Sequence, residues 1–221
     1  MKVAIAGCGR SGTCMLTEII AGSSLLESPQ YMSKTALIDL RFKNNTVSKL
    51  IETFAWGYTR FELLMNRHQD MKILWSVRDP RDILMSKLIR SRNGAQGDGK
   101  ADDGTPSTAI ADIKKMRDLH ERATKEFPYR IYTVRMEDII TDFEGTITDV
   151  CEFLDIPYEK NMETFYTRMR NTKKRRYKTL DKGEVSKWQN WKDAYNGFFK
   201  NTDLDLLFSE LQHEVEWFDY E

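Results

Sequence analysis

Residues 7–13, GCGRSGT, decide the fold of this chain. A short apolar segment, residues 3–6, precedes them, and apolar residues recur at helical spacing from Thr13 onward. The glycines have the spacing G-x-G-x-x-G, which lets backbone N–H groups converge on one anion, and a helix that begins near Gly12 adds the positive end of its dipole. The stretch therefore predicts a strand, a phosphate-binding loop and a helix.

The composition indicates a globular protein without a strong charge bias. The 221 residues are 40% hydrophobic and 11% aromatic, with 34 basic and 34 acidic side chains. This length predicts one domain spanning residues 1–221, and the balanced charge disfavours a general nucleic-acid-binding protein. Because the sequence has neither a long apolar run nor a secretory signal, we expect a cytoplasmic protein without a membrane partner.

Cysteine and histidine usage predicts no metal site. The three cysteines lack C-x-x-C spacing, and the three histidines are scattered along the chain. Such a pattern is typical of free thiols in a reducing compartment.

Two further strands, each followed by a helix, are predicted downstream. The segment 72–77, KILWSV, leads to Asp79 and Pro80, which suit a helix cap and a first helical turn. The segment 129–137 precedes a helix whose apolar residues begin at Phe143. Alternating strands and helices predict an α/β fold with a central parallel sheet flanked by helices. This is a three-layer arrangement similar to P-loop nucleotide-binding folds, with ligands at the carboxyl ends of the strands.

The remaining segments have less distinctive patterns. Residues 23–30 are polar and predict a loop, while residues 93–107 are rich in glycine and predict a mobile loop, either a lid over a substrate site or a surface insertion. Apolar spacing predicts helices over residues 47–66 (one long or two short), 109–125 and 158–170.

The glycine loop matches neither common nucleotide-binding fingerprint in full. An NAD site needs an acidic residue about 20 residues past the glycines, at the end of the second strand, and neither Glu27 nor Asp39 fits well. A kinase-type loop needs lysine where Thr13 stands. An NAD(P)-linked oxidoreductase stays an alternative, as does a nucleotide- or RNA-binding module that uses the basic run at residues 168–178.

Three separated motifs together resemble the sulfotransferases that use 3′-phosphoadenosine 5′-phosphosulfate (PAPS). GRSGT, residues 9–13, resembles the arginine-containing version of the family's 5′-phosphosulfate loop. VRDPRDILMSK, residues 77–87, is similar to its 3′-phosphate motif, with Arg78 and Ser86 at the required spacing. KGEVSKW, residues 182–188, is similar to the segment that closes over the nucleotide, and VRMEDII, residues 134–140, to a common strand-to-helix segment.

The resemblance implies an enzyme that transfers the sulfuryl group of PAPS directly and in line to a hydroxyl of a carbohydrate, small metabolite or other acceptor, releasing 3′,5′-ADP without a metal. Arg10 and Thr13 would also act in catalysis, because fixed donors stabilise the charge that grows on the leaving phosphate oxygen. The implied nucleotide-binding residues are Gly9, Arg10, Ser11, Gly12, Thr13 and Cys14 at the 5′ end, and Arg78, Ser86, Lys182 and Gly183 at the 3′-phosphate.

The resemblance also implies a general base, a histidine or glutamate between the first two motifs. Glu27 is the favoured candidate because arginine-containing members place a glutamate in the loop after the first helix. Glu52, Glu62 and His68 are the alternatives. Met136 stands where the family often has tyrosine, so the residue that packs on the adenine stays open.

Overall fold

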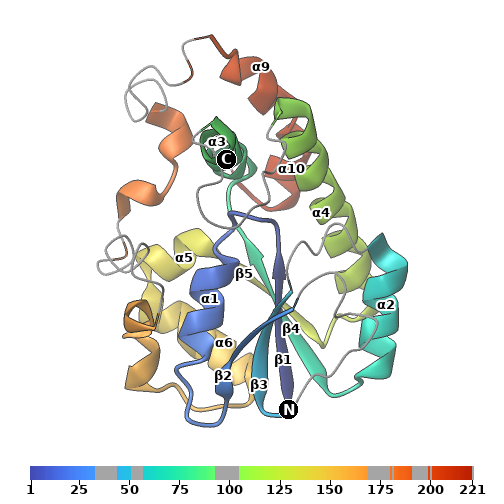
Figure 1. Cartoon of the computed structure of the whole chain (residues 1–221), viewed down its shortest axis with the longest axis vertical. Coiled ribbons are helices and arrows are strands. Elements are labelled where there is room, and N and C mark those ends of the chain that lie inside the picture. Colours follow the sequence, from blue (N-terminus) through green and yellow to red (C-terminus); the bar gives the residue numbers. More distant parts are fainter. Residues whose placement is uncertain are drawn as a thin grey trace.

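Within the described residues, five parallel strands form the central sheet of the computed structural model (Figure 1). The structure describes residues 1–32, 44–50, 57–92, 105–168, 180, 182–190, 199 and 201–220. The strand order across the sheet is β2-β3-β1-β4-β5. The strands are β1 (Lys2–Gly7), β2 (Glu27–Met32), β3 (Thr46–Leu50), β4 (Met71–Val77) and β5 (Ile131–Arg135). The predicted α/β fold with a central parallel sheet is confirmed.

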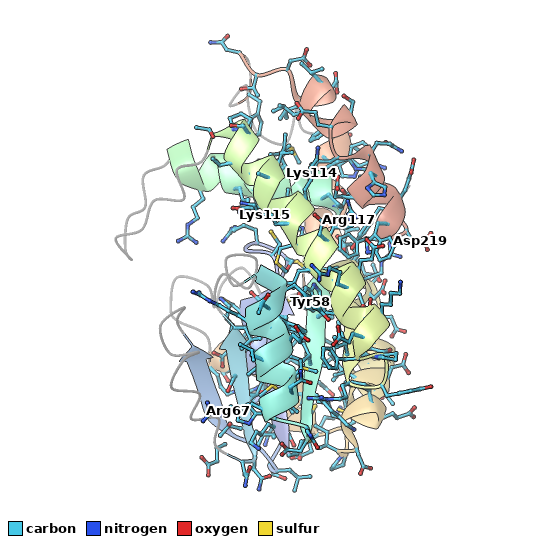
Figure 2. The ribbon with its side chains drawn as sticks, turned by 90° about the vertical axis from the view of Figure 1, so that its right-hand side faces the viewer. Tyr58, Arg67, Lys114, Lys115, Arg117 and Asp219 are labelled. Atoms are coloured by element: carbon cyan, nitrogen blue, oxygen red, sulfur yellow. The ribbon has the colours of Figure 1, made fainter. Side chains whose placement is uncertain are left out.

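Helices cover both faces of this sheet, so the fold has three layers (Figures 1 and 2). One apolar core contains Val3 and Ile5 with side chains of α1, α5 and α6, and the other contains Ala4 and Ala6 with side chains of α2, α3 and α4. Successive strand residues point to opposite faces, which is why β1 contributes to both cores. The helices are α1 (Thr13–Ile20), α2 (Gly57–Arg67), α3 (Pro80–Arg92), α4 (Pro106–Glu126), α5 (Met136–Thr141), α6 (Phe143–Leu154), α9 (Leu204–Ser209) and α10 (Gln212–Trp217).

The strand register brings three strand-to-helix connections together at the carboxyl ends of the strands. Gly7 is aligned with Ser76, and Val77 with Arg135. The turns that lead from β1 to α1, from β4 to α3 and from β5 to α5 therefore lie together, above the sheet in Figure 1. These ends are where parallel α/β sheets bind their ligands.

Two strands lie where the sequence predicted other structure. The predicted loop at 23–30 contains the start of β2, and the predicted helix at 47–66 contains most of β3 together with part of α2. A polar segment that contains Pro29 is compatible with β2 because this strand lies at the edge of the sheet. The five residues of β3 are mostly buried between two neighbouring strands, and so short a run cannot be told from helix by spacing alone.

Two segment boundaries also differ from the predictions. Residues 105–107, predicted as loop, begin α4: Thr105 caps the helix and Pro106 stands in its first turn. The rest of the predicted mobile loop, residues 93–104, lies outside the described residues. Over the described residues 158–168 of the predicted helix at 158–170, the structure has two short 3-10 turns instead, η2 (Lys160–Met162) and η3 (Phe165–Thr167).

Candidate active site

The GCGRSGT turn forms a tight loop between β1 and α1. Gly7 has a φ of 144°, and a Cβ there would collide with the carbonyl oxygen of Ser76 in β4. Gly12 precedes the first residue of α1 with a φ of 93°, in the left-handed region that favours glycine. Arg10 also has a positive φ, 81°, which is uncommon for a residue with a side chain. Backbone strain of this kind is concentrated at functional sites.

The loop is held by its own serine and by the neighbouring strand. The buried Ser11 donates hydrogen bonds to the Cys8 carbonyl from both its hydroxyl (2.8 Å) and its backbone N–H (3.1 Å). The Ser76 hydroxyl donates to the Ser11 carbonyl at 2.5 Å. Ser11, one of the implied nucleotide-binding residues, therefore uses its hydroxyl, its N–H and its carbonyl to hold the shape of the loop.

The N-terminal turn of α1 is built to attract an anion. The residue at the N-cap of α1 is Gly12, which has no side chain to cap the first N–H groups of the helix. Thr13 is buried at this end, and Cys14 is half-buried. These N–H groups and the helix dipole favour a phosphate or sulfate at this point.

Arg10 and Ser86 join the first two motifs. Arg10 Nε donates a hydrogen bond of 2.9 Å to Ser86 Oγ on α3, although the two residues are 76 positions apart in the chain. The resemblance assigned them to opposite ends of the nucleotide. Their direct contact places the loop after β1 beside the helix after β4.

Arg78 lies at the start of the second motif and is almost fully buried. Its Nη2 is 3.5 Å from Asp82 Oδ2, a pairing between residues one helical turn apart. Burial raises the pKa of Asp82 to about 6; Arg78 opposes this rise, while the negative charges of Asp79 and Glu137 add to it. Arg78 therefore shares a buried site with a carboxyl group that titrates near neutral pH.

The third motif reaches the same helix. Lys182 and Gly183 are exposed in the short turn η4 (Lys182–Glu184), which is followed by η5 (Lys187–Asn190). The Trp188 N–H donates to Asp82 Oδ1 at 3.0 Å. Thus the structure brings this segment to α3 through Trp188, and the exposed Lys182 and Gly183 lie a few residues away along the chain.

Lys49 adds a cation that the sequence analysis missed. This residue of β3 places its Nζ 2.9 Å from the Cys14 sulfur, at the N-terminal turn of α1. The segment was predicted to be helical, and nothing in its local pattern indicates that strand pairing would carry Lys49 to the loop.

The structure does not bring the favoured base, Glu27, to this site. Glu27 is aligned with Thr46, and Thr46 with Lys2, so the exposed Glu27 lies level with the first residue of β1. Gly7 lies five residues further along β1, which corresponds to roughly 16 Å at the rise of an extended strand. At this distance, a carboxylate at the amino ends of the strands cannot take a proton from an acceptor bound at the loop.

Of the other predicted bases, His68 lies away from the loop, Glu62 lies on α2, and Glu52 is not described. His68 precedes β4 at the same amino ends of the strands, where its carbonyl accepts the Met71 N–H, and burial together with nearby Lys2 lowers the pKa of its imidazole. Glu62 is half-buried on α2, which packs against α4 on one face of the sheet. Glu52 lies outside the described residues.

Metal-binding clusters and membrane-spanning helices can be assessed in the part of the chain that the structure describes. This part contains no cluster of three or more metal-ligating side chains, and none of its helices has the length and apolarity needed to cross a bilayer.

Comparisons with known proteins identify the family and the fold of this chain. The sulfotransferase family model matches residues 48–160, slightly more than half of the chain. No curated protein matches the sequence. Among solved structures, the sulfotransferase domain from the curacin biosynthetic pathway is 19% identical with a TM-score of 0.73, over 100% of this chain and 98% of that one.

Two more distant structures share the fold and contain a nucleotide. A mouse sulfotransferase complexed with PAP is 16% identical (TM-score 0.55, covering 94% of this chain and 88% of that one). Retinol dehydratase in a complex with retinol and PAP is 14% identical (TM-score 0.52, covering 95% and 80%). The chain described here belongs to the sulfotransferase family.

Proposed function

We propose that this protein transfers the sulfuryl group of PAPS to a hydroxyl group of a carbohydrate, small metabolite or other acceptor. The observation that carries the proposal is the contact between Arg10 and Ser86, which joins the phosphate-binding loop to the helix that begins beside Arg78. PAPS carries anionic groups at its 5′ and 3′ ends, so a site for it needs two cationic subsites, one for each group. Two solved structures with this fold contain its desulfated product, PAP.

The residues at the loop suit the 5′-phosphosulfate. The N–H groups at the start of α1, the Thr13 hydroxyl and the Arg10 guanidinium would surround the phosphate that leaves. As the acceptor oxygen bonds to sulfur and passes its proton to a general base, the bond from sulfur to the phosphate oxygen breaks and negative charge grows on that oxygen. Donors held in place at this oxygen stabilise the transition state more than the bound substrate.

The residues at the start of α3 suit the 3′-phosphate. The Arg78 guanidinium presents a planar pair of donors, which matches the geometry of phosphate oxygens. Ser86, Lys182 and Gly183 would complete this subsite. For the acceptor, the supporting observation is that one structure of this fold contains retinol, an alcohol, together with PAP.

A thermal-shift experiment tests the nucleotide. A ligand that binds only the folded state stabilises it by about 2.7 kcal/mol at one hundred times its Kd. We expect 3′,5′-ADP to raise the Tm and NAD, ATP and short RNA to leave it unchanged. Arg78→Ala should abolish the shift, whereas Arg67→Ala, an exposed arginine at the end of α2 (Figure 2), should preserve it.

Two results would contradict the proposal. One is a shift with NAD alone, which would favour an oxidoreductase. The other is an equal shift with 3′,5′-ADP in both arginine variants, each compared with its own ligand-free Tm.

A further inference from the structure

The Asp82 carboxylate contacts two segments that are far apart in the chain. Its side chain is completely buried (0% exposed), and its Oδ2 lies 3.5 Å from Arg78 Nη2. Its Oδ1 accepts the backbone N–H of Trp188 at 3.0 Å. Oδ2 accepts no hydrogen bond from the described residues. Its interaction with Arg78 is therefore an ion pair at 3.5 Å and not a hydrogen bond.

Trp188 anchors the segment that carries Lys182 and Gly183. The guanidinium carbon of Arg81 lies over the Trp188 ring at 3.5 Å from its centroid, and Phe208 packs against the ring edge to face. The Val185 N–H donates to the Lys182 carbonyl and the Gln189 N–H to the Ser186 carbonyl, each at 3.1 Å, which closes two consecutive turns over residues 182–189. Because these turns are short, the contacts of Trp188 with Asp82 and Arg81 of α3 restrict where Lys182 and Gly183 can lie.

We propose that Asp82 is a positioning residue that couples the Arg78 guanidinium to the Lys182–Gly183 segment. This inference rests on the proposed function, since it concerns the subsite for the 3′-phosphate. A buried carboxylate is costly unless its charge is compensated and its oxygens accept hydrogen bonds. One such group here connects the arginine and the closing segment, so loss of Asp82 releases both elements of the phosphate subsite.

The charges around Asp82 explain why this one carboxylate can hold both Arg78 and the Lys182–Gly183 segment. On α3 and just before it, the charges that act on Asp82 are those of Arg78 and Asp79, and Asp79 is itself paired with Arg81 at 2.7 Å. From α5, Glu137 faces the same site, where it accepts the Asp79 N–H and the Tyr220 hydroxyl. Asp79 is thus paired with Arg81, and Glu137 accepts from Tyr220 while the charge of Arg78 also acts on it. Asp82 is the carboxylate that contacts both Arg78 and the Trp188 N–H.

A double-mutant cycle tests the coupling through the affinity for 3′,5′-ADP, measured by titration calorimetry. Lys182→Ala should weaken binding about tenfold in the unaltered protein but less than about twofold in Asp82→Ala, because the segment is no longer held in place. In Asp82→Asn the side-chain oxygen can still accept the Trp188 N–H, so Lys182→Ala should again cost about tenfold. Asp112→Ala is the matched control: it removes another ion pair of α3, with Lys87 at 2.8 Å, and its effect should add to that of Lys182→Ala.

Hydrogen exchange supplies a readout that needs no nucleotide. We expect the Trp188 amide to lose protection in Asp82→Ala and to keep it in Asp82→Asn and Asp112→Ala. If Asp82→Ala does not fold, Asp82→Ser replaces it, because the shorter hydroxyl cannot reach the Trp188 N–H.

The outcomes separate this inference from the proposed function. If 3′,5′-ADP binds the unaltered protein and Lys182→Ala has the same cost with and without Asp82, the coupling is refuted and the proposed function stands. Unchanged protection of the Trp188 amide in Asp82→Ala would equally refute it. If 3′,5′-ADP does not bind the unaltered protein, both proposals fail.

Discussion

The stability of this protein should depend on the protonation of His120. His120 is buried on α4, and its Nε2 lies 2.8 Å from the Thr133 hydroxyl. The Trp217 indole N–H, which can only donate, lies 3.3 Å from His120 Nδ1. Nδ1 therefore accepts and Nε2 carries the proton, so a second proton on the ring would break the bond to Trp217. Burial lowers the pKa of His120 to about 4 from its ordinary 6.5.

The size and sign of the effect follow from this pKa shift. The folded state favours the neutral ring, so the contribution of His120 is complete above pH 6.5 and is lost progressively as the pH falls toward 4. Between pH 7.5 and pH 5 the free energy of unfolding should fall by about 2 kcal/mol on account of this residue. Asp82 acts in the opposite direction, because its raised pKa of about 6 means that the folded state gains stability as that carboxyl is protonated.

The measurement compares urea unfolding of the unaltered protein and of His120→Gln at pH 7.5 and pH 5. The contribution of Asp82 is common to both proteins and cancels in the difference, which isolates His120. We expect the stability difference between the two proteins to shrink by about 2 kcal/mol at the lower pH. A difference that is independent of pH would refute the inference that His120 is neutral and buried in the folded state.

Two further substitutions test the loop and the base. Gly12→Ala should destabilise the protein by about 1–2 kcal/mol in urea, because the backbone there is left-handed and the new Cβ meets Met136 at 3.3 Å. Gly9→Ala is its control, since a Cβ at Gly9 meets nothing within 4 Å, and equal destabilisation by both would contradict the argument. Glu27→Gln should retain its sulfuryl-transfer rate, because Glu27 lies at the amino ends of the strands; a large loss of kcat would show that this carboxylate does reach the acceptor.

Local structure around the glycine and proline motifs could be predicted from the sequence. Gly7 and Gly12 occupy positions with positive φ, and Pro80 stands at the start of α3, so each motif specifies its own turn within a few residues. The chemical types at these turns, Arg10 and Arg78, already indicated two anion subsites. Their order along the chain was enough to suggest the family that the comparisons then showed.

Pairing between distant segments could be decided only by the tertiary structure. The sequence of β3 is compatible with helix or strand, and its place beside β1 is what carries Lys49 to the loop. The contact between Arg10 and Ser86 and the position of Glu27 at the amino ends of the strands likewise depend on strand order and register. A turn is determined by the dihedral preferences of its own residues, whereas a strand in a parallel sheet is determined by neighbours that the local sequence does not contain.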